Sequence, residues 1–140
     1  MSEPSPCPFC TLADDVPRIA ESASCFAILS RQPIHPFHVL VIPRVHVEAF
    51  PAVPPEVASA VFLMAQGISA AVAKLEGVDG VTHLSDDELG ERQINLVRHY
   101  KLHVIPRTAG ELHRLEWHRA EDPTPEVLGQ RVASLRGLVV

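Results

Sequence analysis

The sequence is poor in cysteine and carries no excess of positive charge. Three cysteines among 140 residues are too few for the disulfide framework of a small secreted protein. The net charge of −5 leaves no basic stripe that could displace counterions from a nucleic-acid backbone. We therefore expect an intracellular protein with no nucleic-acid partner.

Long apolar runs are absent as well. None approaches the roughly 20 residues that a membrane span needs. Residues 1–8 also lack the basic and apolar regions of a secretory signal. These absences predict a cytoplasmic protein without a membrane segment. The hydrophobic residues that are present, 46% of the chain, suffice for one core, so we expect a single domain over 1–140.

Three segments predict β-strands. Residues 25–29 and 39–42 are short runs rich in apolar and β-branched residues, and Pro43 stops the second run. Residues 97–105 alternate in character until Pro106. Residues 1–24, by contrast, are rich in loop-forming residues.

Two helices are expected. Apolar residues recur at spacings of three and four over 55–75, with Gly77 suited to the helix end. A second helix is expected to begin after Thr124, which suits an N-cap, and to end near Gly137. Between them the acidic stretch 86–91 predicts a solvated loop. The residues expected to point inward from the second helix are Val127, Leu128, Val132 and Leu135.

The strand over 97–105 places a row of titratable side chains on one face. Successive side chains alternate faces, so Val97, His99, Lys101 and His103 share one side. Such a row can border one ligand, or bind a metal at one end and a ligand at the other. The alternative is an exposed strand face with scattered polar residues.

The pair Cys7-Pro8-Phe9-Cys10 suits metal binding or redox chemistry. A structural zinc site needs four ligands, and the two cysteines supply only half of them. His38 and His46 stand at the two ends of the predicted 39–42 strand. The redox alternative is weaker, because a thioredoxin-type motif opens a helix directly after a strand and residue 7 leaves no room for one.

The sequence resembles the histidine triad (HIT) family from Cys10 to Arg107. The family's upstream block is a histidine that opens an apolar strand ending in Pro-basic-x-His. It matches His38-Val39-Leu40-Val41-Ile42-Pro43-Arg44-Val45-His46. The downstream signature His-φ-His-φ-His-φ-φ, often followed by Pro-Arg, matches His99-Tyr100-Lys101-Leu102-His103-Val104-Ile105-Pro106-Arg107 at every place but one.

This resemblance implies an α+β fold. It implies an antiparallel sheet of about five strands, one long helix, a C-terminal helix in an extension over 108–140, and a homodimer. Family members that carry the cysteine pair bind one structural zinc, which here pins the arm over 1–24 to the sheet. Carried over residue by residue, the zinc ligands are Cys7, Cys10, His46 and His99.

The match departs from the family where the chemistry lies. The family's middle triad histidine attacks the α-phosphate of a nucleotide, and that place is Lys101. The acidic residue that binds the ribose hydroxyls is replaced by Ser30, and Phe37 stands where a Gly or Thr is common. The usual Gly-Gln before the triad is replaced by Ile94-Asn95, with Gln93 next to it.

We therefore expect a divergent enzyme that acts on a nucleotide or other phosphate-ester metabolite, with Lys101 as its catalytic group. Lysine can serve as a free amine nucleophile or as a protonated point charge. Other hypotheses are a biosynthetic tailoring enzyme that uses this amine, and a catalytically silent ligand-binding zinc protein. The sequence leaves open whether Trp117 and His118 line the site. The expected partners of the lysine are His103 and His38, and the expected substrate-binding residues are Asn95, Gln93 and Ser30.

Overall fold

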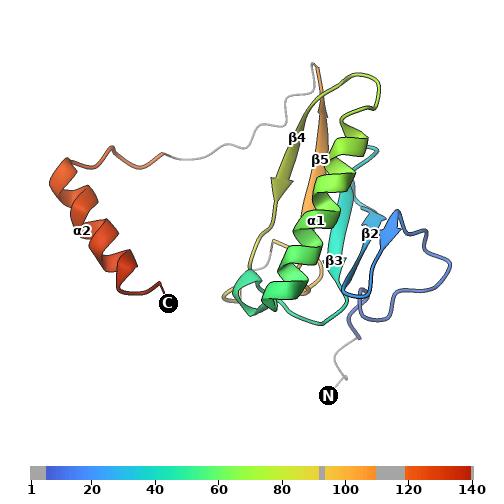
Figure 1. Cartoon of the computed structure of the whole chain (residues 1–140), viewed down its shortest axis with the longest axis horizontal. Helices are drawn as coiled ribbons and strands as arrows, with labels where there is room; N and C mark the ends of the chain where they lie inside the picture. The colour runs from blue at the N-terminus through green and yellow to red at the C-terminus, as the bar shows by residue number, and fades with distance from the viewer. Residues whose placement is uncertain (1–5, 92–93, 110–118, 140) are drawn as a thin grey trace.

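The computed structural model describes residues 6–91, 94–109 and 119–139, and its centre is one five-stranded sheet (Figure 1). Every pair of neighbouring strands is antiparallel. This arrangement confirms the α+β class predicted from the sequence. Across the sheet the strands are β1 (Ala20–Glu21), β2 (Cys25–Leu29), β3 (Val39–Pro43), β5 (Leu102–Thr108) and β4 (Val78–Leu84).

The long helix α1 (Pro55–Val72) covers one face of the sheet, after a short 3-10 turn η1 (Phe50–Ala52). Its inward stripe is formed by Val61, Ala65, Ile68 and Val72, which are buried against apolar side chains of β2, β3 and β5. The expected helix to residue 75 ends earlier, because the next turn tightens: Leu75 N donates to Val72 O at 3.1 Å.

By length and composition alone, α1 could also cross a membrane, with a mean hydropathy of 1.3 over 18 residues. The same composition suits the central helix of a protein core. Because four of its residues are buried against the sheet, packing accounts for its apolar character.

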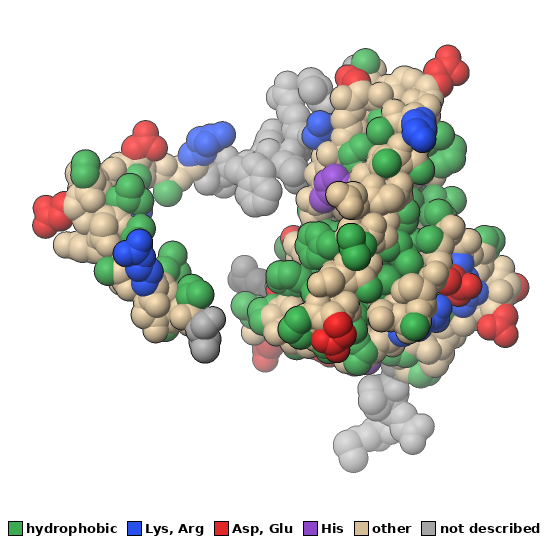
Figure 2. All heavy atoms as spheres, in the orientation of Figure 1, with side chains coloured by type: hydrophobic (Ala, Val, Ile, Leu, Met, Phe, Trp, Pro, Cys, Tyr) green, Lys and Arg blue, Asp and Glu red, His purple; other side chains and the backbone are tan. Residues whose placement is uncertain are grey.

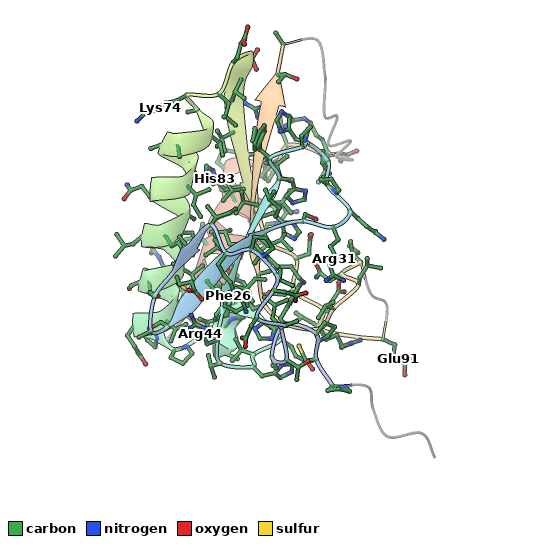
Figure 3. The ribbon with its side chains drawn as sticks, turned by 90° about the vertical axis from the view of Figure 1, so that its right-hand side faces the viewer. Phe26, Arg31, Arg44, Lys74, His83 and Glu91 are labelled. Carbon is green, nitrogen blue, oxygen red and sulfur yellow. The ribbon has the colours of Figure 1, made fainter. Side chains whose placement is uncertain are left out.

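The N-terminal arm covers the opposite face of the sheet. Phe26 and Ile28 of β2 and Leu40 and Ile42 of β3 form a second apolar cluster. The arm adds Phe9, Leu12 and Val16 to that cluster. In Figure 3, α1 lies at the left of the view, and Phe26 of β2 is labelled to its right. The arm is thereby positioned against the sheet before any metal is considered.

Strand β5 begins at Leu102, later than the alternation predicted. The backbone of 97–101 bonds elsewhere: Tyr100 N donates to Val47 O at 2.6 Å, and His99 N donates to Val97 O at 3.0 Å. Consequently only His103 of the titratable row stands on a regular strand. It faces away from α1, because its neighbours Leu102 and Val104 face toward the helix.

Helix α2 (Pro125–Arg136) begins at the expected cap, since Thr124 Oγ1 accepts a hydrogen bond from Val127 N at 3.3 Å. The expectation that its apolar residues point into a core is wrong for this single chain. Leu128, Val132 and Leu135 are 52%, 40% and 62% exposed. The reason is visible in Figure 1, where α2 stands apart from the sheet.

Candidate functional site

Four side chains gather where the arm meets the sheet. Cys7 and Cys10 come from a tight turn in the arm, His46 follows β3, and His99 precedes β5. Their candidate ligand atoms all lie within 4.8 Å of one another. Cys7 Sγ is 3.4 Å from His99 Nδ1, and Cys10 Sγ is 3.3 Å from His46 Nδ1. The four residues expected from the sequence are thus brought together.

The imidazole orientations suit a cation. His99 Nε2 lies 2.8 Å from Pro43 O, so that nitrogen carries the proton and Nδ1 presents its lone pair to the cluster. His46 also turns Nδ1 inward, and its Nε2 is 3.8 Å from a Glu48 oxygen. Two thiols and two imidazole nitrogens are the ligand set that tetrahedral zinc prefers.

The Cys10 thiol is held in its protonated form more firmly than a free thiol. Burial, followed by the hydrogen bond and charge of Cys7, raises the pKa of the Cys10 thiol. A bound zinc ion would displace the thiol protons, because thiolate is the ligating form.

A small network surrounds the cluster. Glu48 contacts His46 and also Arg98, with 3.8 Å between the charged atoms of the second pair. Arg98 in turn donates to Gly90 O at 3.0 Å. The ring of Phe9 meets His99 edge to face at 5.8 Å between centroids. These contacts orient the two histidines from outside.

Beyond the cluster, on the face away from α1, His38 and His103 form a pair. Leu40 pairs with His103 across β3 and β5, and His38 lies two residues before Leu40. His38 Nε2 and His103 Nδ1 are 2.9 Å apart. Strand register therefore joins two histidines that are far apart in sequence.

The hydrogen bonds of this pair fix its tautomers. Ile34 N donates to His38 Nδ1 at 3.1 Å, so the His38 proton sits on Nε2 and is donated to His103 Nδ1. The remaining His103 proton is then on Nε2. That atom is buried and has no hydrogen-bond partner in the described part of the chain. One N–H donor is thus left for a ligand.

Burial favours the neutral form of both rings. Burial lowers the pKa of His38. Burial, then the charges of His38 and Lys101, lowers the pKa of His103 to about 4. The His103 donor is therefore an uncharged imidazole N–H.

Lys101 is buried, with 7% of its surface exposed. Its Nζ donates to Val97 O at 3.0 Å and lies 5.6 Å from the centre of the Phe9 ring. Burial lowers the pKa of Lys101, while the charges of Cys7 and Glu88 oppose that shift. The amine thus lies between the metal cluster and the histidine pair. The predicted place of Lys101 in a pocket stays a prediction.

The acidic stretch 86–91, predicted to be a solvated loop, makes side-chain hydrogen bonds to the backbone that follows it. Glu88 Oε1 accepts hydrogen bonds from Ile94 N at 2.7 Å and from Asn95 N at 2.9 Å. These bonds lower the pKa of Glu88. Asn95 Nδ2 donates to Asp86 O at 2.8 Å and also contacts Glu88. These hydrogen bonds therefore link Asp86 and Glu88 to Ile94 and Asn95, which precede His99 in the chain.

The remaining residues expected at the site from the sequence are Ser30, Gln93, Trp117 and His118. Ser30 follows β2, and its backbone N donates to His38 O at 2.8 Å. Gln93, Trp117 and His118 lie outside the described residues. Substrate binding by Ser30 and Asn95 stays a prediction.

Sequence reasoning missed the residues that support the site. Phe9, Glu48 and Glu88 carried no motif signal, although Phe9 lies inside the cysteine pair and Glu48 two residues after His46. Backbone carbonyls such as Pro43 O leave no trace in a sequence at all. Only the folded chain identifies them.

Comparison with known proteins gives a consistent picture. The sequence pattern of the HIT domain matches residues 14–110. Adenylylsulfatase HINT3 of Arabidopsis thaliana is 30% identical over 90 residues, which are 64% of this chain and 45% of that protein. The bis(5'-adenosyl)-triphosphatase of Dictyostelium discoideum is 34% identical over 82 residues, which are 59% of this chain and 54% of that enzyme. The chain therefore spans about half the length of these two relatives.

Solved structures share the fold. A HIT family member from Bacillus subtilis superposes with a TM-score of 0.83 at 27% identity, covering 97% of this chain and 99% of that one. A zinc-bound histidine triad family protein from Mycobacterium smegmatis gives 0.67 at 30% identity, covering 96% and 98%. The second structure shows that a relative with this architecture holds zinc.

Proposed function

Because the chain belongs to the HIT domain family, we propose that it is an enzyme acting on a nucleotide or other phosphate-ester metabolite. Two relatives bear the names of enzymes that act on nucleotides, an adenylylsulfatase and a bis(5'-adenosyl)-triphosphatase. In our proposal Lys101 takes the place of the family's middle triad histidine, with His38 and His103 beside it.

One observation carries this proposal: the buried His103 Nε2–H that lacks a partner. A buried donor without an acceptor costs free energy, about 1–3 kcal/mol, which a bound acceptor would recover. A phosphate oxygen suits this donor, because hydrogen bonds to charged acceptors are the strongest. His38 holds the His103 ring in the tautomer that leaves Nε2–H free.

The histidine pair acts in this proposal as a hydrogen-bond donor rather than as a general acid. If His103 gave its Nε2 proton away, His38 would have to pass on its own, and a backbone N–H already occupies the other His38 nitrogen. Such a neutral donor stabilises negative charge on a phosphate oxygen without moving a proton.

Lys101 supplies the nucleophile in this scheme. Burial favours its neutral amine. The amine nitrogen forms a bond to phosphorus as the bond from phosphorus to the leaving oxygen breaks, and the proton given up by the amine passes to that oxygen. Water then cleaves the phosphorus–nitrogen bond and restores the amine.

In this proposal zinc stabilises the fold and takes no part in the reaction. Cys7, Cys10, His46 and His99 would fill all four positions of the ion, which supplies a cross-link between arm and sheet when bound. No position is then left for a substrate. The protein side of the site is held in place through Phe9 and Pro43, which contact His99.

A second candidate is a ligand-binding zinc protein without turnover. The contacts of Lys101 favour it, since the amine is already engaged by Val97 O and the Phe9 ring. To reach a phosphorus atom, the side chain has to leave both partners.

We also propose that the protein is a cytoplasmic homodimer whose partner is a small molecule rather than nucleic acid or a membrane. The net charge of −5 supports the exclusion of nucleic acid.

The test is a panel of nucleotides and phosphate esters assayed for binding and turnover with wild type, His103→Leu and Lys101→Met. We expect His103→Leu to weaken binding and Lys101→Met to abolish turnover while binding persists. Turnover that survives in Lys101→Met would exclude the lysine as nucleophile. Binding without turnover in the wild type would select the second candidate.

A further inference from the structure

Two of the three cysteines differ from the third in their access to solvent. Cys10 is exposed and Cys7 is half-buried, and both lie in the arm on the face of the sheet away from α1. Cys25 is buried under α1, with its Sγ 3.9 Å from Met64 Sδ, and Figure 2 shows hydrophobic side chains gathered over that helix. A dissolved oxidant can therefore reach the cysteine pair of the arm and not the core cysteine.

The turn that carries the pair has the size that a disulfide needs. Cys10 N donates to Cys7 O at 3.1 Å, and Thr11 N and Thr11 Oγ1 donate to the same oxygen at 3.2 and 3.1 Å. A turn closed in this way keeps the Cα atoms at its ends within about 7 Å, and a disulfide needs about 4.4–6.8 Å. The two sulfur atoms lie within 4.8 Å of each other. A disulfide can therefore form within the existing turn.

Phe9 couples the cysteine pair to the site proposed above. It lies between the two cysteines in the chain, and its ring meets His99 edge to face at 5.8 Å between centroids. The amine of Lys101 lies 5.6 Å from the centre of the same ring. A change in the turn is therefore transmitted to Lys101 through a single side chain.

We propose that Cys7 and Cys10 are a redox-modification site, at which a peroxide forms a disulfide, expels the zinc ion and shifts Phe9 away from Lys101. The exposed Cys10 reacts first: its thiolate attacks one oxygen of hydrogen peroxide, becomes a sulfenic acid and releases hydroxide. The thiolate of Cys7 then attacks the sulfur of that sulfenic acid, which forms the disulfide and releases a second hydroxide. Two protons convert both hydroxides to water, so two electrons pass from sulfur to peroxide.

The disulfide removes half of the ligand set and leaves the sheet in place. Disulfide sulfur carries no charge, so His46 and His99 alone remain, whereas a structural zinc ion needs four ligands. The arm stays on the sheet, because Leu12 and Val16 pack on the apolar cluster beneath it. Oxidation therefore changes the tip of the arm without unfolding the domain. An added dithiol reverses the step by thiol–disulfide exchange.

This inference goes beyond the proposed function and needs no substrate. Disulfide formation, zinc release and the surroundings of Lys101 are each measured on the protein alone. The redox site is therefore confirmed or overturned whether or not the chain turns over a phosphate ester.

The first test follows the disulfide and the metal together. Zinc-loaded wild type is treated with equimolar hydrogen peroxide, its mass is measured, and released zinc is titrated with a chromogenic chelator. We expect a mass lower by two hydrogen atoms and loss of most of the zinc, both reversed by a dithiol and fresh zinc. The matched control Cys25→Ala should respond as wild type does. Zinc that stays bound, a product that gains oxygen, or a response that needs Cys25 would each overturn the proposal.

The second test assigns the roles of the two cysteines in a Cys25→Ala background. Cys7→Ser leaves Cys10 without a partner, so its sulfenic acid should persist and be trapped by dimedone. Cys10→Ser retains only the less exposed Cys7 and should be labelled at least fivefold more slowly. Circular dichroism checks that both variants fold. Equal labelling rates, or faster labelling of Cys7, would overturn the order of attack.

The third test measures the coupling to Lys101. The chain has only two lysines, so a spectrum of the protein with lysine labelled by ¹³C at Cε shows one signal each for Lys74 and Lys101. Phe9→Leu removes the ring and identifies the Lys101 signal by its shift toward that of the exposed Lys74. We expect oxidation to move the Lys101 signal in the same direction and to leave the Lys74 signal unchanged. An unmoved Lys101 signal in protein that has formed the disulfide and lost zinc would overturn the coupling.

Discussion

Replacement of Lys101 by methionine separates a chemical role of this residue from a structural one. Methionine keeps much of the length of the side chain and removes the amine. In the folded protein the amine donates to Val97 O and lies over the ring of Phe9. Lys101→Met removes both contacts, which lowers stability. It also removes the desolvation free energy of a buried amine, which raises stability.

The opposing contributions are of similar size. In its protonated resting form, from which the neutral fraction reacts, Lys101 gains about 1.5–3 kcal/mol from its hydrogen bond and about 0.5–2 kcal/mol from its cation–π contact. Desolvation of a buried charge costs several kcal/mol, and apolar replacement of buried charges is often neutral or stabilising. We therefore expect the free energy of unfolding to change by no more than about 2 kcal/mol.

The assay combines thermal unfolding with turnover of whichever phosphate ester the panel identifies. Lys74→Met is the matched control, because Lys74 and Lys101 are the only two lysines and Lys74 is exposed. We expect both variants to fold, and only Lys101→Met to lose turnover.

Two results would refute this reasoning. Full turnover in Lys101→Met removes the lysine from the chemistry. A loss of folding far larger than expected, with Lys74→Met unaffected, would show that the Phe9 and Val97 contacts are structural necessities.

Four further predictions concern the metal cluster, the histidine pair and the activity expected at Lys101. Purified protein should contain one zinc per chain by elemental analysis, and Cys7→Ser should lower both zinc content and melting temperature, because metal binding is linked to folding. Glu48→Gln should weaken zinc affinity about 10-fold or more by chelator competition, since Glu48 orients His46 from outside; an unchanged affinity would count against that contact. The His103 resonance should titrate near pH 4 by NMR, and its contribution to stability should be full above pH 6.5 and lost as the pH falls toward 4, because the fold disfavours its protonated form; a titration near 6.5 would contradict the described burial. Wild type should hydrolyse adenosine phosphoramidate or dinucleoside polyphosphates weakly or not at all, and Lys101→His should raise that activity; robust wild-type turnover would contradict this.

Much of the fold was predictable from the sequence because its signals are local. The runs at 25–29 and 39–42 are the strands β2 and β3, and a proline ends the second as expected. The period of α1 and the Thr124 cap of α2 are equally local signals. The brief β1 and the edge strand β4 were not located, since β4 contains Gly80 at a register shift and lacks clean alternation.

The metal cluster was predictable only through the resemblance, because its residues are far apart in sequence. The alternation argument placed His99 and Lys101 on a strand, whereas the chain turns there and donates Tyr100 N to Val47 O. A non-local backbone bond of this kind has no sequence signature. The same holds for the tautomers of the histidine pair, which depend on Ile34 N and on strand register.

The most direct test of the central claim is the binding of a phosphate ester to the unpartnered His103 donor. Isothermal titration of the nucleotide and phosphate-ester panel into wild type and His103→Leu measures it, with the zinc content of both proteins checked first. Loss of one hydrogen bond to a charged acceptor, about 1.5–3 kcal/mol, corresponds to a 10-fold to 150-fold weaker dissociation constant. We predict a loss in this range for at least one ligand, together with a shifted His103 resonance in the wild-type complex. Ligands that bind wild type and His103→Leu equally, or a panel that contains no ligand, would contradict the account.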